Sequence, residues 1–516
     1  MLRNIELNNR EIFMTQQSTI GVVEIPDLGL IDSEGKDWLT HNSKGAILIS
    51  KQILLASLQD AGFETHLHDL GNGDYQEEYG KVTWGDTEFT KIYIGGKIDN
   101  LEPLAYDAWG VTNNFSQTRE TACLAIKHLA SKGRPVVIGG SDAIAAPQAY
   151  LAAGAAAIVL DKSGAANAPI MDYVLGRTPR KELSGVMLAS GSQPPIRVKR
   201  ALSPQDWPLP AVSVAKECLG TWYKGIELPE KHWPIGSIFS DIGCDRSCDF
   251  CQTPRYRLGY RAMTPERVLQ WAAIQKEAGA KAVMLSSDQF LGRIVKKGGR
   301  EDILEIMKGI RDMGLAVFWN NGLELKKMTL GRGINRKTGA DLTPDEELIS
   351  ALYGWNGKTG CFYAYTAAER PLVGREKYAK LLPWQEHCEI VKAIVRAGVA
   401  NIRYGLIIGF ADDSHDSLLR LEEAVSELYE ELVIINPSQN FQVAPFSVSP
   451  IPGTPLSNSL RQSGLLHFDE PSLYGSIWTT SVDSHHLSYK EIYDWQKRLT
   501  QIGRTRYMED GLAIAS

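Results

Sequence analysis

The chain has 516 residues, 43% of them hydrophobic and 22% charged, which is typical of a globular protein with two or three separately cored domains. The formal net charge is −6, and Lys and Arg are spread along the chain without a basic block, so we expect no nucleic-acid partner. The N-terminus has no apolar stretch of the signal-peptide kind, and no apolar run approaches the roughly 18 residues that a membrane span needs. These features predict a cytoplasmic protein without a membrane span.

Residues 20–165 alternate strand-like and helix-like segments and predict one α/β domain behind an N-terminal tail, residues 1–19. The apolar spacing of residues 43–62 is helical, with Ser43 placed to cap the helix and Gly62 to end it. Residues 74–98 predict an inserted hairpin, because aromatic and β-branched residues alternate there with polar ones. The remaining alternation is the pattern of an open, doubly wound (flavodoxin-like) parallel sheet.

The rest of the chain divides into three parts. Residues 166–232 gather prolines and lose the periodicity, so we expect a linker that packs on the domains it joins. Residues 233–455 resume the alternation, and their strands, each followed by a helix, predict a partial (β/α)6 barrel with functional residues at the carboxyl ends of the strands. Residues 456–516 lack this rhythm and are expected to form a small C-terminal cap.

Seven cysteines are an odd number, which argues against a disulfide framework and for reduced thiols or metal ligands. Cys244, Cys248 and Cys251 lie within eight residues as C-x3-C-x2-C, just after a predicted strand. Three closely spaced thiolates can hold three corners of a [4Fe-4S] cluster and leave the fourth iron open. A structural zinc site is the main alternative, but it needs four ligands, and no histidine or further cysteine lies near the loop.

This loop at the start of a βα barrel resembles the radical S-adenosylmethionine (SAM) superfamily, over about residues 233–456. The resemblance implies that the three cysteines hold a [4Fe-4S] cluster, that SAM chelates its open iron, and that Phe250 lies against the adenine. A glycine-glycine-glutamate motif, frequent after the second strand in that family, is replaced here by SSD. The further SAM contacts that the resemblance implies are Ser286, Ser287, Asp288, Asn320, Tyr365, Glu369, Arg403 and Ile408.

Several of these side chains have an alternative role. Ser286, Asp288, Asn320 and Asn321 are equally expected as strand-end polar residues satisfied by loop backbone. Arg403 is expected to point into the barrel, where it could pair with a carboxylate of SAM or of the substrate, or with a structural acid.

A flavodoxin-like sheet ahead of such a barrel resembles the cobalamin-binding subgroup of the superfamily. In that subgroup the loops after the third and fourth strands contact the corrin and its nucleotide tail, and here they correspond to residues 113–118 and 138–143. Paired glycines let a ligand approach the backbone closely. A sheet that binds no cofactor is the alternative. The implied cobalamin contacts are Asn113, Asn114, Phe115, Ser116, Gly139, Gly140 and Ser141.

Many cobalamin-binding sheets carry D-x-H-x-x-G, whose histidine ligates cobalt. The nearest match here is His66-x-His68-x-x-Gly71, which follows the second strand instead of the first, so we expect His68 to be a polar strand-end residue. Methylthiotransferases of the superfamily carry three extra cysteines for a second cluster, and only Cys123 and Cys218 precede the barrel here. The sequence therefore disfavours that subclass.

Together the resemblances imply a radical methyltransferase with three cofactors: a [4Fe-4S] cluster, SAM and cobalamin. A low-potential donor such as flavodoxin or ferredoxin would reduce the cluster, a 5′-deoxyadenosyl radical would remove hydrogen from an unactivated carbon of a small-molecule or natural-product substrate, and methylcobalamin would supply the methyl group. One alternative is a cobalamin-dependent radical enzyme that cyclises, rearranges or oxidises; the other is a non-catalytic iron-sulfur or ligand-binding sensor. Trp478, His485 and His486 are candidate substrate-pocket residues, with simple packing as the alternative.

Overall fold

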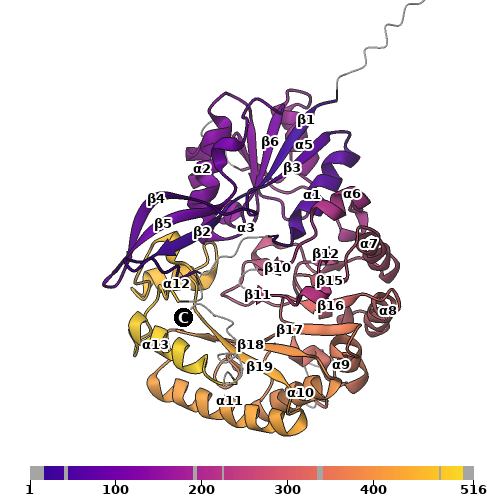
Figure 1. Cartoon of the computed structure of the whole chain (residues 1–516), viewed down its shortest axis with the longest axis vertical. Coiled ribbons are helices and arrows are strands. Elements are labelled where there is room, and N and C mark those ends of the chain that lie inside the picture. Colours follow the sequence, from indigo (N-terminus) through magenta and orange to yellow (C-terminus); the bar gives the residue numbers. More distant parts are fainter. Residues whose placement is uncertain are drawn as a thin grey trace, which may run out of the picture.

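The computed structural model describes residues 17–39, 45–189, 195–223, 226–333, 341–475 and 478–503. Figure 1 shows an N-terminal α/β sheet domain stacked on a barrel of strands and helices, with a projecting hairpin and a C-terminal cap along one side. Within these residues, no helix is long and apolar enough to cross a membrane.

The N-terminal sheet is doubly wound, as the sequence predicts. Its parallel strands lie in the order β3-β1-β6-β7-β8, which is the flavodoxin order 2-1-3-4-5, and β9 adds an antiparallel edge. One apolar core fills the space under α1 and α5, and a second fills the opposite face under α2 and α4. The strands are β1 (Thr19–Glu24), β3 (Glu64–Asp69), β6 (Ala108–Thr112), β7 (Val136–Gly139), β8 (Ala157–Val159) and β9 (Val186–Leu188); the helices are α1 (Ile49–Asp60), α2 (Arg119–Ala130), α3 (Ser141–Ala145), α4 (Pro147–Ala152) and α5 (Asn167–Val174).

Two details differ from the sequence-based expectation. Helix α1 begins at Ile49 without a side-chain cap, and Ser43 lies outside the described residues; Gly62 follows the helix with a φ of +87°, which suits glycine. Part of the expected linker, residues 166–232, contains α5 and β9, which belong to the sheet domain. A three-residue strand is too short to show a period in sequence, so only its pairing with β8 reveals it.

A smaller antiparallel sheet projects from this domain. It has the order β2-β5-β4, with β2 (Asp27–Ile31), β4 (Tyr75–Trp84) and β5 (Thr87–Gly95), so the hairpin expected over residues 74–98 is confirmed. Its apolar face shares a core with the cap, and the Trp84 indole N–H donates to the carbonyl of Thr480 at 2.8 Å. The hairpin therefore links the sheet domain to the C-terminal cap (Figure 1).

The second large sheet is a six-stranded parallel half-barrel in simple sequence order, β12-β15-β16-β17-β18-β19. Alternate strand residues face the helices in one large core or fill the barrel interior in another. Its strands are β12 (Ile235–Phe239), β15 (Ala282–Ser286), β16 (Ala316–Trp319), β17 (Gly360–Glu369), β18 (Asn401–Ile408) and β19 (Asn440–Ser447); its helices are α7 (Pro265–Glu277), α8 (Gly299–Asp312), α9 (Glu346–Tyr353), α10 (Trp384–Ala397) and α11 (His415–Ile435).

Helix α1 of the sheet domain covers the open edge of this barrel beside β12. The fully buried Gln52 amide bonds Ser237 Oγ at 3.1 Å, and its Oε1 accepts from Trp271 at 3.0 Å and from Gln275 at 2.8 Å. On the far side, α12 (Pro455–Gln462) and α13 (Tyr489–Leu499) form the cap, and Gln496 of α13 donates to Pro445 of β19 at 3.1 Å. Helix α1 thus joins the sheet domain to the barrel, and α13 joins the cap to the barrel.

Candidate functional site at the barrel mouth

The three cysteines lie on a loop whose neck is closed by backbone. Short strands β13 (Asp241–Ile242) and β14 (Arg261–Ala262) pair on either side of it. Gly243 has a φ of +78°, and a Cβ there would lie 1.7 Å from the carbonyl oxygen of Gly259. Only glycine fits this close approach, so the neck depends on that residue.

Cys248 is buried, while Cys244 and Cys251 are partly exposed. Burial raises the pKa of the Cys248 thiol to about 11 and also raises that of Cys244, so metal binding must remove these protons. Among the described residues, no three His, Cys, Asp or Glu side chains converge on a point where one metal ion could sit. A cubane cluster does not require such convergence, because each thiolate bonds a different iron.

Charged residues inside the loop anchor it to the barrel. The ammonium of fully buried Lys327 lies 2.7 Å from Asp245 and 3.4 Å from Glu324, and Arg246 Nε donates to Glu324 at 3.1 Å. Asp249 accepts a hydrogen bond of 2.7 Å from the hydroxyl of Tyr378. Sequence reasoning missed these anchors; the acid and arginine between the cysteines were the available signal.

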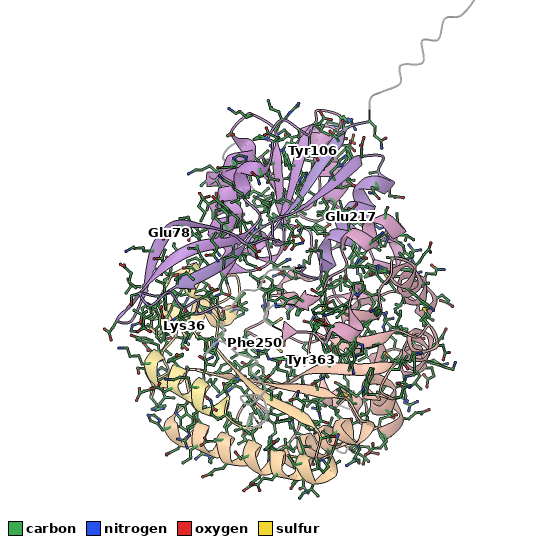
Figure 2. The ribbon with its side chains drawn as sticks, in the orientation of Figure 1. Lys36, Glu78, Tyr106, Glu217, Phe250 and Tyr363 are labelled. Atoms are coloured by element: carbon green, nitrogen blue, oxygen red, sulfur yellow. The ribbon has the colours of Figure 1, made fainter. Side chains whose placement is uncertain are left out.

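Phe250 lies near the middle of the molecule, below the sheet domain, in the apolar cluster that joins the barrel mouth to the cap (Figure 2). Its ring makes edge contacts with Tyr378 and Phe410, at centroid distances of 5.3 and 6.4 Å, and the Lys380 ammonium lies 5.3 Å from its centre. Phe410 follows β18, so Phe250 packs against the carboxyl end of that strand.

The SSD segment lies at the carboxyl end of β15. Asp288 accepts the backbone N–H of Gly243 at 2.7 Å, which is the loop-backbone role foreseen as the alternative. Burial raises the Asp288 pKa, an effect that the nearby Lys162 ammonium opposes. Ser286 donates to Asn320 at 3.0 Å, and Ser287 is 3.1 Å from the hydroxyl of Ser240. These side chains form the polar rim beside the cysteine loop.

Glu369 ends β17 in an unusual state. Its φ of +59° is rare for a residue with a side chain, its Oε1 pairs with Lys380, and its buried Oε2 has no hydrogen-bond partner among the described residues. Burial raises its pKa, which the Lys380 ammonium opposes. A strained backbone and an unsatisfied buried oxygen are together typical of a ligand-binding residue.

The two predicted residues on β18 point in opposite directions. Ile408 packs into the core under the helices, and its carbonyl accepts the N–H of Val448 at 2.8 Å, so neither its side chain nor that oxygen faces the mouth. Ile407 instead packs in the cluster that contains Phe250 and Cys251. Arg403 faces the barrel interior beside Tyr365.

At the carboxyl edge of the N-terminal sheet, the predicted residues do come together. Asn113 is buried and donates to Tyr150 at 2.8 Å, and Asn114 Oδ1 accepts the N–H of Ser141 at 3.0 Å. Gly140, which follows Gly139 of β7, has a φ of +106°, and a Cβ there would lie 2.1 Å from the carbonyl oxygen of Asn113. Ser116 donates to Asp142 at 2.6 Å, whereas Phe115 is 47% exposed.

This sheet edge faces the cysteine loop. Lys162, just after β8, donates to Ser141 Oγ at 2.9 Å, and its ammonium lies 5.7 Å from the ring centre of Tyr256, which follows the third cysteine. Burial lowers the Lys162 pKa, an effect that the charge of Asp288 opposes. Sequence reasoning did not find Lys162 or Tyr256, because their proximity exists only across the domain interface.

The remaining candidates contact other residues of the protein or are exposed. The Nε2 atom of His68 is 2.9 Å from the hydroxyl of Tyr106, the partner expected of a polar strand-end histidine. His485 and His486 are exposed, and Trp478 packs edge-on against Tyr493 at 6.3 Å. All seven cysteines are free thiols.

No family model matches the chain. A biotin synthase of Erythrobacter litoralis is 28% identical over 233 residues, which cover 44% of this chain and 57% of that protein. The ribosomal protein uS12 methylthiotransferase RimO of Saccharopolyspora erythraea is 40% identical over 55 residues, 11% of each chain.

Two groups of solved structures share the architecture. The cobalamin-dependent SAM radical enzyme OxsB, solved with aqua-cobalamin and SAM bound, matches with a TM-score of 0.66 at 13% identity, covering 94% of this chain and 66% of OxsB. The radical SAM methyltransferase TsrM of Kitasatospora setae, solved with cobalamin and a [4Fe-4S] cluster, matches with a TM-score of 0.61 at 11% identity, covering 95% and 92%. This chain spans less than two thirds of the biotin synthase and of OxsB.

The chain therefore has the fold of the cobalamin-dependent radical SAM enzymes, which confirms the fold expected from the resemblance. Within that fold it is similar to OxsB and to TsrM over nearly its whole length.

Proposed function

We propose that this protein is a cobalamin-dependent radical SAM enzyme that binds a [4Fe-4S] cluster, SAM and cobalamin. The carrying observation is the opposition of two carboxyl edges: the cysteine loop at the barrel mouth faces the glycine loop of a flavodoxin-like sheet, and Lys162 contacts both. Ligands of open α/β sheets bind outside the carboxyl ends of their strands, at the switch point. Here two such edges meet.

The residues at the barrel mouth fit the cluster and SAM. Cys244, Cys248 and Cys251 offer three thiols on one anchored loop, and a fourth iron without a protein ligand would leave a position for SAM. The unpartnered buried Oε2 of Glu369 suits an ammonium donor such as the amino group of SAM. The other SAM contacts within the proposal are Phe250, Ser286, Ser287, Asp288 and Asn320.

The sheet edge fits cobalamin. Gly140 brings the loop after β7 against the backbone of Asn113, and a side chain there would block this approach. The loops of residues 113–118 and 138–143 are tied to one another by Asn114 and Ser141, so they form one preformed surface. Asn113, Asn114, Phe115, Ser116, Gly139, Gly140 and Ser141 are the proposed cobalamin contacts.

When bound, these cofactors supply one-electron cleavage of SAM and methyl transfer to carbon. The chain itself fixes the cysteine loop through Lys327 and Arg246 and buries the rim residues, which keeps water from the reacting groups. We infer that the reaction methylates an unactivated carbon of a small molecule, supported by the likeness to TsrM, a radical SAM methyltransferase. Cyclisation, rearrangement or oxidation without methyl transfer is the competing outcome.

Two further elements belong to the proposal. A low-potential donor such as flavodoxin or ferredoxin would reduce the cluster. A cytoplasmic location would keep the cysteines that bind no cluster reduced.

The test begins with protein purified without oxygen. Iron, sulfide and cobalt are measured together after reconstitution with iron, sulfide and hydroxocobalamin, and we expect four irons and one cobalt per chain. Reduced protein is then incubated with SAM labelled with carbon-13 in its methyl group and with a small-molecule extract of the source cells. Near-equal amounts of 5′-deoxyadenosine and S-adenosylhomocysteine, with the label in a new product, would support carbon methylation.

Other results would redirect the proposal. 5′-Deoxyadenosine without S-adenosylhomocysteine would replace methylation by cyclisation, rearrangement or oxidation. A bound cluster without any SAM cleavage would favour a non-catalytic iron-sulfur protein, and absence of cobalt would remove cobalamin.

A further inference from the structure

The barrel interior has a polar layer at the height of Arg403. Below it, Met284, Phe318 and Tyr363 fill the interior with apolar side chains. The next inward-facing positions lie side by side, because Tyr365 pairs with Arg403 and Arg403 with Gln442, while Ser286 donates to Asn320 at 3.0 Å. The members of this layer are Ser286, Asn320, Tyr365, Arg403 and Gln442.

One half of this layer is satisfied within the protein. Ser286 bonds Asn320, and the Asn320 amide in turn donates to the hydroxyl of Tyr223 at 3.0 Å. Tyr223 reaches the barrel from the segment that joins the two domains and packs edge-on against Phe318. The hydrogen-bonding groups of Ser286 and Asn320 are thus paired within the protein.

Arg403 is different. It makes no hydrogen bond or ion pair with another residue in the described part of the chain, and its Nε is buried without a partner. Its guanidinium carbon lies 6.0 Å from the ring centre of Phe446, on the neighbouring strand toward the mouth. A partly buried charge without a counter-charge is costly, so its retention indicates an anionic ligand.

Tyr365 provides a second donor at the same place. Its ring crosses Gly405, where a Cβ would lie 2.0 Å from the phenol oxygen, and it packs edge-on against Phe446 at 5.9 Å. Burial raises the Tyr365 pKa, so the phenol keeps its proton and can donate. Its hydroxyl, too, bonds no other residue that the structure describes.

The carboxylate of SAM has a nearer cation. Lys380 contacts Phe250, pairs with Glu369 and acts electrostatically on Cys248. The backbone of Arg403, in contrast, lies four residues before Ile407, the β18 residue that packs against the cysteine loop, which is roughly 13 Å along an extended strand. The sequence resemblance implies Arg403 as a SAM contact; this position favours a different ligand.

We propose that Arg403 and Tyr365 bind a carboxylate of the substrate, so that the substrate is a monoanionic small molecule whose acid group enters the barrel. The inference rests on the proposed function, because it assumes that SAM occupies the mouth. A planar guanidinium matches a carboxylate with two parallel hydrogen bonds, and its single positive charge balances one negative charge.

The test uses the reconstituted protein with SAM bound. Indole-3-acetate and hexanoate are compared with their primary amides by ligand-observed NMR, using wild type, Arg403→Met, Arg403→Lys and Tyr365→Phe. An exposed arginine on α10, Arg396, supplies the matched control Arg396→Met. We expect at least one acid to bind more tightly than its amide, binding to fall about tenfold or more in Arg403→Met, and partial retention in Arg403→Lys.

A second measurement distinguishes binding of the substrate from binding of SAM. SAM affinity is determined by equilibrium dialysis for each variant, and we expect it to stay within about twofold of wild type. A tenfold loss of SAM affinity in Arg403→Met would overturn the proposal and assign the residue to SAM, as would the lack of any preference for acids over amides. If wild type itself fails to bind the cluster or SAM, the proposed function fails instead.

Discussion

At the scale of single residues, the barrel mouth is marked by groups that the rest of the protein does not satisfy. Glu369 has a left-handed backbone; within the part of the chain that the structure describes, one of its carboxylate oxygens has no hydrogen-bond partner, and Arg403 has no counter-ion. Other buried polar atoms without a partner also occur among the described residues, such as the hydroxyl of Tyr353, but Glu369 and Arg403 carry charged groups at the barrel mouth and in the barrel interior. Leaving a charged group without a partner in a buried position is costly, so these two side chains are candidates for ligand contacts.

The cysteine loop gives the first prediction. Changing Cys248 to serine should remove most of the iron and sulfide from the reconstituted protein and abolish SAM cleavage, because a buried hydroxyl replaces the thiolate that the cluster needs. Iron, sulfide and 5′-deoxyadenosine are measured. Cys388→Ser, at a partly buried thiol on α10, is the control and should retain both. A full cluster in the Cys248 variant would contradict the assignment.

Asp69 gives a prediction about pH. Burial, and then the charge of Glu24, raise its pKa from 3.8 to about 6, although Gly71 donates a backbone N–H to it at 3.0 Å. The folded protein thus holds this proton more tightly than the unfolded chain. The charged carboxylate therefore lowers stability above pH of about 6, and this cost disappears as the pH falls toward 3.8.

Asp69→Asn should consequently raise the free energy of unfolding at neutral pH by on the order of 1 kcal/mol, since the site is only partly exposed, and the gain should shrink in acid. Urea unfolding at several pH values measures it, with Asp60→Asn at the exposed end of α1 as the control. A gain that grows as the pH falls would show that the sign is wrong.

At the scale of elements, the hairpin of β4 and β5 holds the sheet domain to the cap. Trp84 is 5% exposed and lies between the rings of Tyr489 and Tyr493, at 5.3 and 5.2 Å. Asp86 in the turn pairs with Lys490 of α13 at 2.5 Å. Since α13 also bonds β19, the hairpin restrains the far wall of the barrel as well as the cap.

Trp84→Ala should weaken the contact between the hairpin and the cap. Loss of a buried indole and its hydrogen bond costs about 3–5 kcal/mol locally, so hydrogen exchange should accelerate in both residues 75–95 and α13. Tyr75→Ala, at the other end of the same strand and 37% exposed, should leave α13 unchanged. Unaltered hydrogen exchange of α13 in the Trp84 variant would show that the hairpin does not stabilise the cap.

At the scale of the whole molecule, two sheets present their carboxyl edges to each other. The Gln52 network joins the sheet domain to the barrel on one side, and the hairpin joins it to the cap on the other. These contacts fix the position of the two edges relative to each other. Lys162 stands between them, bonded to the sheet loop and close to the cysteine loop. Lys162 therefore contacts residues of both proposed cofactor sites.

Lys162→Met should therefore lower the cobalamin retained after gel filtration severalfold while leaving the iron content unchanged, because it removes a donor from Ser141 but no cluster ligand. Cobalt and iron are measured together. Lys132→Met, at an exposed lysine after α2, is the control. Equal loss of iron and cobalt would indicate general unfolding, and unchanged cobalt would remove Lys162 from the proposed site.

The sequence by itself determined the two α/β alternations, the hairpin and the cysteine loop. These are local signals, because hydrophobic period, turn residues and the spacing of thiols are all written within a few tens of residues. The loops of residues 113–118 and 138–143 were also predictable, since both follow strands in a fold whose strand order is regular.

Only the tertiary structure decided the rest. Three contacts join residues that are far apart in the chain: the pairing of β9 with β8, the hydrogen bond from Trp84 to Thr480, and the approach of Lys162 to the barrel. No local hydrophobic period encodes such contacts. The direction of Ile407 and Ile408 depends on the register of β18, where one residue separates the barrel mouth from the helix core. The pairing of Arg403 with an acidic side chain likewise depends on which residues the neighbouring strands place beside it.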